Sequence, residues 1–136
     1  MSMDLCYIDQ NQSVQSMLNV SNGNYYRFIR FVSDVLQDNA TQWQEVVDSQ
    51  DLSDTGDDSY DAWKRETAAE EQDELVSVNN LYDAWSSENC NVSDVLLAMS
   101  VCINDPNAKQ YLGYIAQIVK MGTQTLMSGN PRTYWA

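Results

Sequence analysis

The sequence predicts an all-α fold of four to five helices, with a long central helix and a C-terminal αα-hairpin. Only two prolines and five glycines interrupt the 136 residues, which is few for a β fold with many turns. Hydrophobic residues make up 43% of the chain, and they recur mostly at three- and four-residue steps, as on the buried face of an amphipathic helix. This length and composition indicate a single domain, 1–136.

The expected helices follow one another along the chain with short breaks between them. In chain order they cover residues 13–20, 25–50, 59–88, 91–105 and 108–129. The other segments are expected to be irregular: a flexible arm at 1–12, an acidic loop at 49–59 and a tail at 130–136. Within 25–50, Asn39 and Thr41 disfavour a helix interior, so one bent helix and two short helices both fit that segment.

The four-residue sequence "YDAW" occurs twice in the long helix expected over 59–88, at 60–63 and at 82–85. A separation of 22 residues is almost six helical turns, so the two copies return to within about 40° of each other. The residues that flank the two copies do not align, which favours helical phase over a duplicated binding unit. Alternating steps of four and three residues, typical of a coiled coil, join positions 71, 75, 78, 82 and 85.

The C-terminal part of the chain predicts two helices joined by a very short turn. Residues 91–105 are apolar around most of the helix circumference, which indicates a position central to a core or an interface. The sequence "NDPN" (104–107) is typical of a tight turn. Gly113 and Gly122 in the last helix leave room for the close approach of another helix.

Acidic residues are unevenly distributed along the chain. There are 20 acids, seven bases and no histidine, which gives a net charge of −13, and such a surface repels nucleic-acid phosphates and anionic lipids. Eleven acids but only two bases lie within residues 48–74. This segment is either a solvated surface or a docking face for a basic protein. The residues expected to form that docking face are Asp57, Asp58, Glu70, Glu71 and Glu74.

The sequence predicts no enzyme activity, no metal site and no cofactor. General acid–base catalysis and activated cysteines most often depend on histidine, which is absent. The acidic loop does not match an EF-hand calcium loop, because Ala62 stands where a bidentate glutamate is needed. Cys6, Cys90 and Cys102 are expected to be reduced and mostly buried. No signal-peptide pattern or transmembrane run is visible, so we expect no membrane insertion and a cytoplasmic protein, or one exported without a cleaved signal peptide.

One part of the sequence resembles a known family. The segment "LLAMSVCINDPNAKQYLGYIAQIVKMGTQTLMSGNPRTYW" is similar to the helix–turn–helix of type III secretion needle and filament subunits, chiefly through "NDPNAKQYLGYIAQ". The shared features are an apolar helix, a short Asn/Asp-Pro turn and a second helix that bears Gln and Tyr. The resemblance implies self-assembly or export through a secretion channel. Small acidic secretion chaperones are similar in size and charge.

These observations predict a non-catalytic helical protein that acts through protein–protein interaction, either with a partner or with a second copy. One hypothesis is a bacterial secretion-system assembly component, exported subunit or chaperone. The alternative is an acidic phage-type inhibitor or DNA mimic that blocks a basic nucleic-acid-binding protein. The aromatic residues expected to contact a partner, although each would also suit the chain's own core, are Trp63, Tyr82, Trp85, Tyr111 and Tyr114.

Overall fold

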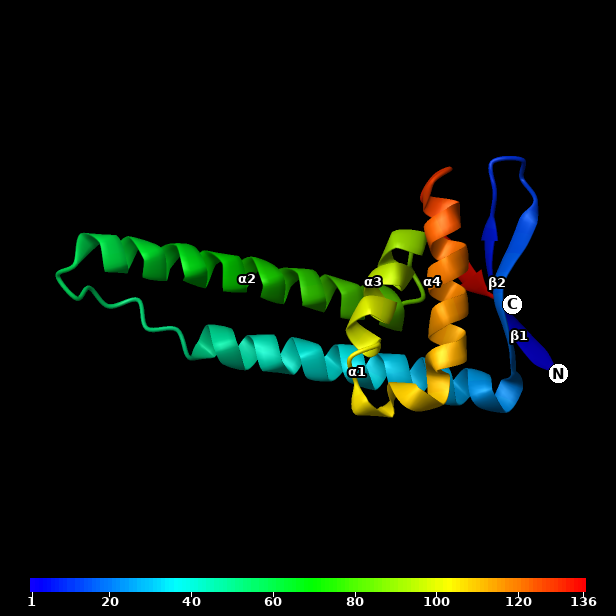
Figure 1. The fold of residues 1–136 in the computed structure, drawn as a ribbon, viewed down its shortest axis with the longest axis horizontal. Helices are drawn as coiled ribbons and strands as arrows, with labels where there is room; N and C mark the ends of the chain where they lie inside the picture. Colours follow the sequence, from blue (N-terminus) through cyan, green and yellow to red (C-terminus); the bar gives the residue numbers. More distant parts are fainter.

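In the computed structural model, which describes all 136 residues, two long antiparallel helices project from a head that holds three strands and two shorter helices (Figure 1). The elements, in chain order, are β1 (Ser2–Ile8), β2 (Val14–Ser21), α1 (Asn22–Asp48), α2 (Asp58–Ser86), α3 (Val92–Cys102), the 3₁₀ helix η1 (Pro106–Tyr111), α4 (Leu112–Leu126) and β3 (Thr133–Trp135). The strands form an antiparallel sheet in the order β2-β1-β3. The fold is therefore α+β, and the all-α prediction is wrong.

The N-terminal segments predicted as a flexible arm (1–12) and a short helix (13–20) instead contain the paired strands β1 and β2. Met17 is the extra residue of a bulge in β2 and is buried together with Leu18. Two consecutive apolar residues that both reach the core interrupt the alternation by which a strand is recognised. The bulge therefore explains why the sequence of residues 13–20 lacks the pattern of a strand and was predicted to form a helix.

The turn between β1 and β2 is held by an aspartate. Asp9 Oδ1 accepts hydrogen bonds from the backbone N–H groups of Asn11 and Ser13, each at 2.9 Å. Gln12 adopts the left-handed backbone conformation, with φ of 61°. Side-chain bonding of this kind replaces the Gly or Pro that commonly marks a hairpin turn, so the hairpin carried no strong turn signal.

The tail expected at 130–136 contains the third strand. Asp4 of β1 and Ala136 exchange backbone hydrogen bonds at 2.7 and 2.9 Å, so the two ends of the chain lie close together (Figure 1). On its other edge, the backbone N–H of Thr133 donates to the Cys90 carbonyl at 2.8 Å. β3 thus joins the N-terminal hairpin to the segment that leads into α3.

The long helices expected over 25–50 and 59–88 are confirmed as α1 and α2. α1 runs without a break, so the alternative of two short helices is wrong. Thr41 is accommodated inside the helix because its Oγ1 donates a hydrogen bond to the Gln37 carbonyl, at 3.1 Å. The two helices are antiparallel and form the arm.

The two C-terminal helices, expected over 91–105 and 108–129, are α3 and α4, and η1 joins them where a tight turn was expected. Pro106 takes the first position of η1, where its missing N–H is not needed. Gly122 permits close packing of α4 on α3, because a Cβ atom there would lie 2.8 Å from Leu96 Cδ2. A Cβ atom at Gly113 would meet nothing within 4 Å, so that glycine makes no such contact.

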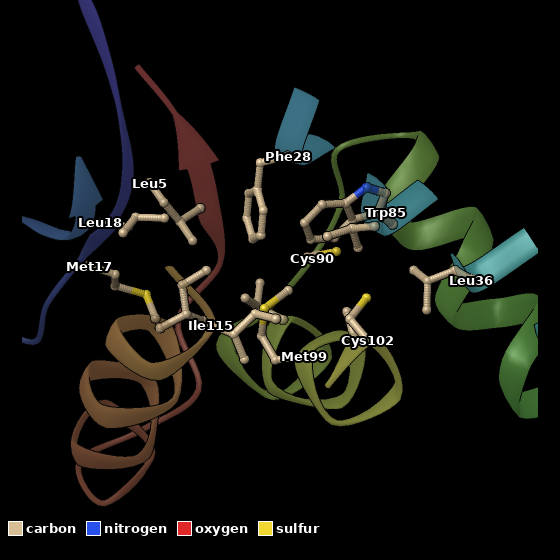
Figure 2. Close-up of a cluster of buried hydrophobic side chains, with 14 of the residues drawn as sticks. Leu5, Met17, Leu18, Phe28, Leu36, Trp85, Cys90, Met99, Cys102 and Ile115 are labelled. Carbon is tan, nitrogen blue, oxygen red and sulfur yellow. The ribbon is translucent and has the colours of Figure 1, made fainter. Parts of the chain in front are cut away.

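A single hydrophobic core of 18 buried residues holds the head together. Figure 2 shows side chains from the strands and from α1, α2, α3 and α4 converging on it. Phe28 of α1 lies in this core and is completely buried. Between residues 37 and 77, by contrast, only Asp61 and Ala68 are buried. The outer half of the arm is therefore a thin, solvent-exposed extension of the fold.

Candidate functional site

The outer half of the arm is the part of the molecule furthest from the sheet. In Figure 1, α1 and α2 run side by side away from the head, and the loop between them forms the far end. Gln50 holds the two helices together here. Its Nε2 donates to the Ala68 carbonyl, and its Oε1 accepts from Gln72 Nε2, both at 3.0 Å. We call residues 48–74 the acidic end of the arm.

The acidic end of the arm has a high density of negative charge. It carries eleven acids and two bases, a net charge of −9. Its share of α2, from Asp58 to Glu74, extends over about 25 Å of helix axis. The seven acids and two bases of this share of α2 give roughly one net negative charge per 5 Å, against about 1.7 Å for duplex DNA and about 3.4 Å for one of its strands. The chain's one ion pair, Arg65–Asp54 at 3.6 Å, is also in this region and is exposed.

Four exposed carboxylates form what we call the acidic face: Glu66, Glu70, Asp73 and Glu74. Steps of four residues separate Glu66, Glu70 and Glu74, so these three line up at intervals of about 6 Å along the helix axis. The buried Ala68, which contacts Gln50, marks the side of α2 that faces α1. The acidic face is turned away from that side and is open to a partner.

An exposed aromatic pair lies at the start of the same helix. The rings of Tyr60 and Trp63 are stacked, with centroids 5.9 Å apart, and the two residues are 47% and 58% exposed. Lys64 Nζ lies 5.5 Å from the centre of the Tyr60 ring. Leu52, in the loop, is also half exposed. Exposed aromatic rings beside carboxylates are suited to contact arginine and lysine side chains.

Two aspartates hold the loop at the far end of the arm in place. Asp57 caps α2, because its Oδ1 accepts hydrogen bonds from the N–H groups of Ser59 and Tyr60, each at 3.1 Å. Asp61 is only 4% exposed. Its carboxylate accepts hydrogen bonds from the Thr55 backbone N–H and from Thr55 Oγ1, at 3.1 and 2.9 Å. Both carboxylates are thus used within the loop.

Acidification is expected to release the loop at Asp61. Burial raises the pKa of this carboxyl, but the hydrogen bonds from Thr55 and the charges of Lys64 and Arg65 outweigh it, so the pKa lies below its ordinary value of 3.8. A lowered folded-state pKa means that the stabilisation is present above 3.8 and is lost as the pH falls through the lowered value. The Thr55 amide resonance should report this transition by NMR, and Asp61→Asn should abolish it. A midpoint at or above 3.8 would contradict the assignment.

The five acids predicted to form a docking face have different surroundings. Asp57 is engaged as the helix cap, and Glu71 is partly buried. Four of the five are exposed, and three of these have no role as a cap: Asp58, Glu70 and Glu74. Glu66 and Asp73 were not singled out from the sequence, although their four- and three-residue steps to Glu70 are a helical signal that could have identified them.

The five aromatic residues predicted to contact a partner do not lie together. Trp63 is on the arm and exposed, whereas Trp85 is in the core and 8% exposed. Tyr82, Tyr111 and Tyr114 are partly buried against the same core. The two YDAW copies therefore have different environments, one at the exposed end of the arm and one at the head. Tyr60, in the first copy, joins Trp63 as an exposed aromatic residue that sequence reasoning did not select.

The cysteines lie in the head and are poorly suited to act as nucleophiles. All three are buried. Burial raises the pKa of Cys90 and of Cys102 to about 12, and it also raises the pKa of Cys6. A thiol with so high a pKa is almost wholly protonated at neutral pH, whereas the thiolate is the reactive form. No group of three or more Cys, Asp or Glu side chains is arranged to hold a metal ion.

The native protein is expected to be nearly inert toward a thiol reagent such as DTNB at neutral pH. After unfolding in guanidinium chloride, all three cysteines should react rapidly. The rate of thionitrobenzoate release, measured for the native and for the unfolded protein, reports the reactivity of the cysteines in each. Rapid release from the native protein would contradict the burial of these thiols. It would mean that at least one cysteine is able to act as a nucleophile.

None of the helices combines the length and the apolar character needed to cross a membrane. Comparison of the chain with protein-family models, with curated proteins and with solved structures found no match.

Proposed function

We propose that this is a non-catalytic binding protein that uses the acidic end of its arm to occupy a basic, nucleic-acid-binding surface of another protein. The observation that carries the proposal is the net charge of −9 on residues 48–74, at the exposed end of a projecting helical hairpin. A basic surface built to bind closely spaced phosphates is complementary to such a density of carboxylates. Long-range attraction between the two would also accelerate their encounter.

The exposed aromatic pair supports the same proposal. Carboxylates alone give an association that is fast and salt-sensitive, and apolar or aromatic anchors supply much of the remaining affinity. Tyr60 and Trp63 are exposed within one helical turn of each other at the start of α2, and Glu66 and Glu70 follow on the next two turns. The arm thus offers an anchor and a row of charges on a single helix.

A binding role fits the residues better than a catalytic one. The chain has no histidine, and its cysteines are buried with raised pKa values. Two carboxylates with organised hydrogen bonds at the far end of the arm, Asp57 and Asp61, are engaged in holding the loop. They maintain the shape of the acidic end and leave the acidic face free.

The hypothesis of a secretion-system assembly component, exported subunit or chaperone rests on the sequence resemblance of the C-terminal hairpin and stays a prediction. It differs from the proposed function in its expected response to salt. Binding through carboxylates weakens as salt screens the charges, whereas binding through apolar helical faces persists.

Affinity capture from extracts of the native host tests the proposal. The tagged protein is loaded at low salt and washed with rising salt, and the retained proteins are identified by mass spectrometry. We expect a basic nucleic-acid-binding protein that elutes as the salt rises. A helical partner that is retained at high salt would contradict the proposal and favour the secretion-type hypothesis.

A further inference from the structure

A second surface of the molecule lies on the head, apart from the acidic arm. A groove of about 700 Å³ lies between α3 and α4, and its lining is mostly apolar. Met99 and Ile115, which are buried, contribute to both the groove and the core. Three partly exposed residues also line it, with exposed fractions between 41% and 47%: Ile103, Leu112 and Val119. Aliphatic side chains gathered in one groove at this level of exposure are typical of an interface.

The distribution of charge along the chain allows a second copy of the chain to bind at this groove. Residues 89–136, which include α3 and α4, carry two acids and three bases, a net charge of +1. The first 88 residues carry 18 acids and four bases. Two copies of so acidic a chain repel each other over most of their surfaces, but not where α3 meets α4. The acidic end of the arm is also far from α4 in Figure 1, so a contact at the groove need not bring the two arms together.

One charged residue lines the groove, and an acidic residue follows its other end in the sequence. Lys120 lines it and is eight residues beyond Leu112, or about 12 Å further along α4. Asp105 precedes η1 at the opposite end, close in sequence to Ile103. A two-fold axis that crosses the middle of the groove at right angles to its length reverses its direction in the second copy. Lys120 of each copy then lies toward Asp105 of the other, and the apolar side chains meet between them.

We propose that the α3–α4 groove is the interface of a two-fold symmetric homodimer. Closed two-fold pairing is the commonest symmetry of soluble oligomers, and it covers the groove of both copies at once. The dimer would present two acidic arms, so a partner or nucleic-acid-binding array with two basic sites would be bound more tightly than by one arm. No residue that lines the groove belongs to residues 48–74. An experiment can therefore disprove the dimer without disproving the proposed function, and the reverse.

Sedimentation equilibrium of the full chain tests the dimer. The wild-type protein is expected at about twice its 15.5 kDa chain mass when it is near 100 µM. Leu112→Asp and Val119→Asp should each raise the dimer dissociation constant by about 100-fold, because each buries an unpaired carboxylate in the interface. Both residues are more than 40% exposed in the single chain, so the monomer should stay folded, as circular dichroism will verify.

Leu52→Asp is the matched control, since Leu52 is equally exposed, lies on the arm and gives the same charge change. It should leave the dimer intact. Lys120→Glu should weaken the dimer through repulsion of Asp105. A wild-type mass of 15.5 kDa at the highest concentration would overturn the proposal, and so would a dimer that persists in folded Leu112→Asp. A monomer whose groove variants lose a different protein partner would also overturn it.

Discussion

Neutralising the acidic face is expected to reduce affinity for the basic partner by about 100-fold. In the variant Glu66→Gln, Glu70→Gln, Asp73→Asn and Glu74→Gln, four exposed carboxylates are lost. If each contributes about 0.7 kcal/mol, within the range for exposed charge pairs, the sum of about 2.8 kcal/mol corresponds to that factor. Biolayer interferometry with the captured partner at low salt measures it, and the association rate should account for much of the change.

A second variant with the same net charge controls for non-specific electrostatics. It neutralises four exposed acids outside residues 48–74, namely Asp34, Asp38, Asp83 and Glu88. If the partner contacts the acidic face directly, the control variant should lose much less affinity for the partner than the acidic-face variant. Equal losses in the two variants would mean that overall charge, and not the arm, directs binding. Amide replacements keep the side chains similar in size, so both variants should fold.

Replacing Phe28 by alanine is expected to lower the free energy of unfolding by about 3–5 kcal/mol. The side chain is completely buried, and its ring centroid lies 5.7 Å from that of Tyr111 and 5.5 Å from that of Tyr114. The substitution therefore removes apolar burial, aromatic contacts from η1 and α4, and the packing of α1 on the head. A domain of this size has a stability of about 5–15 kcal/mol, so the loss is a large part of the total. Urea unfolding followed by circular dichroism measures it.

Tyr26→Ala is the matched control for Phe28→Ala. Tyr26 is an aromatic residue on the same helix, but it is 71% exposed. Its removal should change the free energy of unfolding by about 0.5 kcal/mol or less. Similar losses at the two positions would contradict the claim that burial in the core explains the effect of Phe28→Ala, because alanine raises the helix propensity at both positions.

The helices could be predicted because their signal is local. A three- and four-residue spacing of apolar side chains is visible within a few turns, and it identified α1, α2, α3 and α4 with small errors at their ends. The sheet could not be predicted in the same way. Its third strand has only three residues and pairs with a strand at the other end of the chain, through contacts such as Asp4 with Ala136. Such non-local pairing leaves little local pattern.

The candidate site was predictable in its location but not in its details. The concentration of acids in residues 48–74 was evident from composition. Which carboxylates are free depended on the loop, because Asp57 is taken up by the helix cap and Asp61 by Thr55. Helical phase placed the two YDAW tryptophans on nearly the same side of α2, yet only Trp85 is covered by the head. The length of the arm beyond the core, which the sequence did not reveal, leaves Trp63 exposed.

Competition with nucleic acid tests most directly whether the acidic arm occupies a nucleic-acid-binding surface. The captured partner is loaded with a fluorescent oligonucleotide, and anisotropy is followed as this protein is added. We predict that the wild-type protein and the charge-matched control displace the oligonucleotide, and that the acidic-face variant does so only at about 100-fold higher concentration. Simultaneous binding of both ligands by the partner, or equal displacement by the acidic-face variant, would contradict the proposed function.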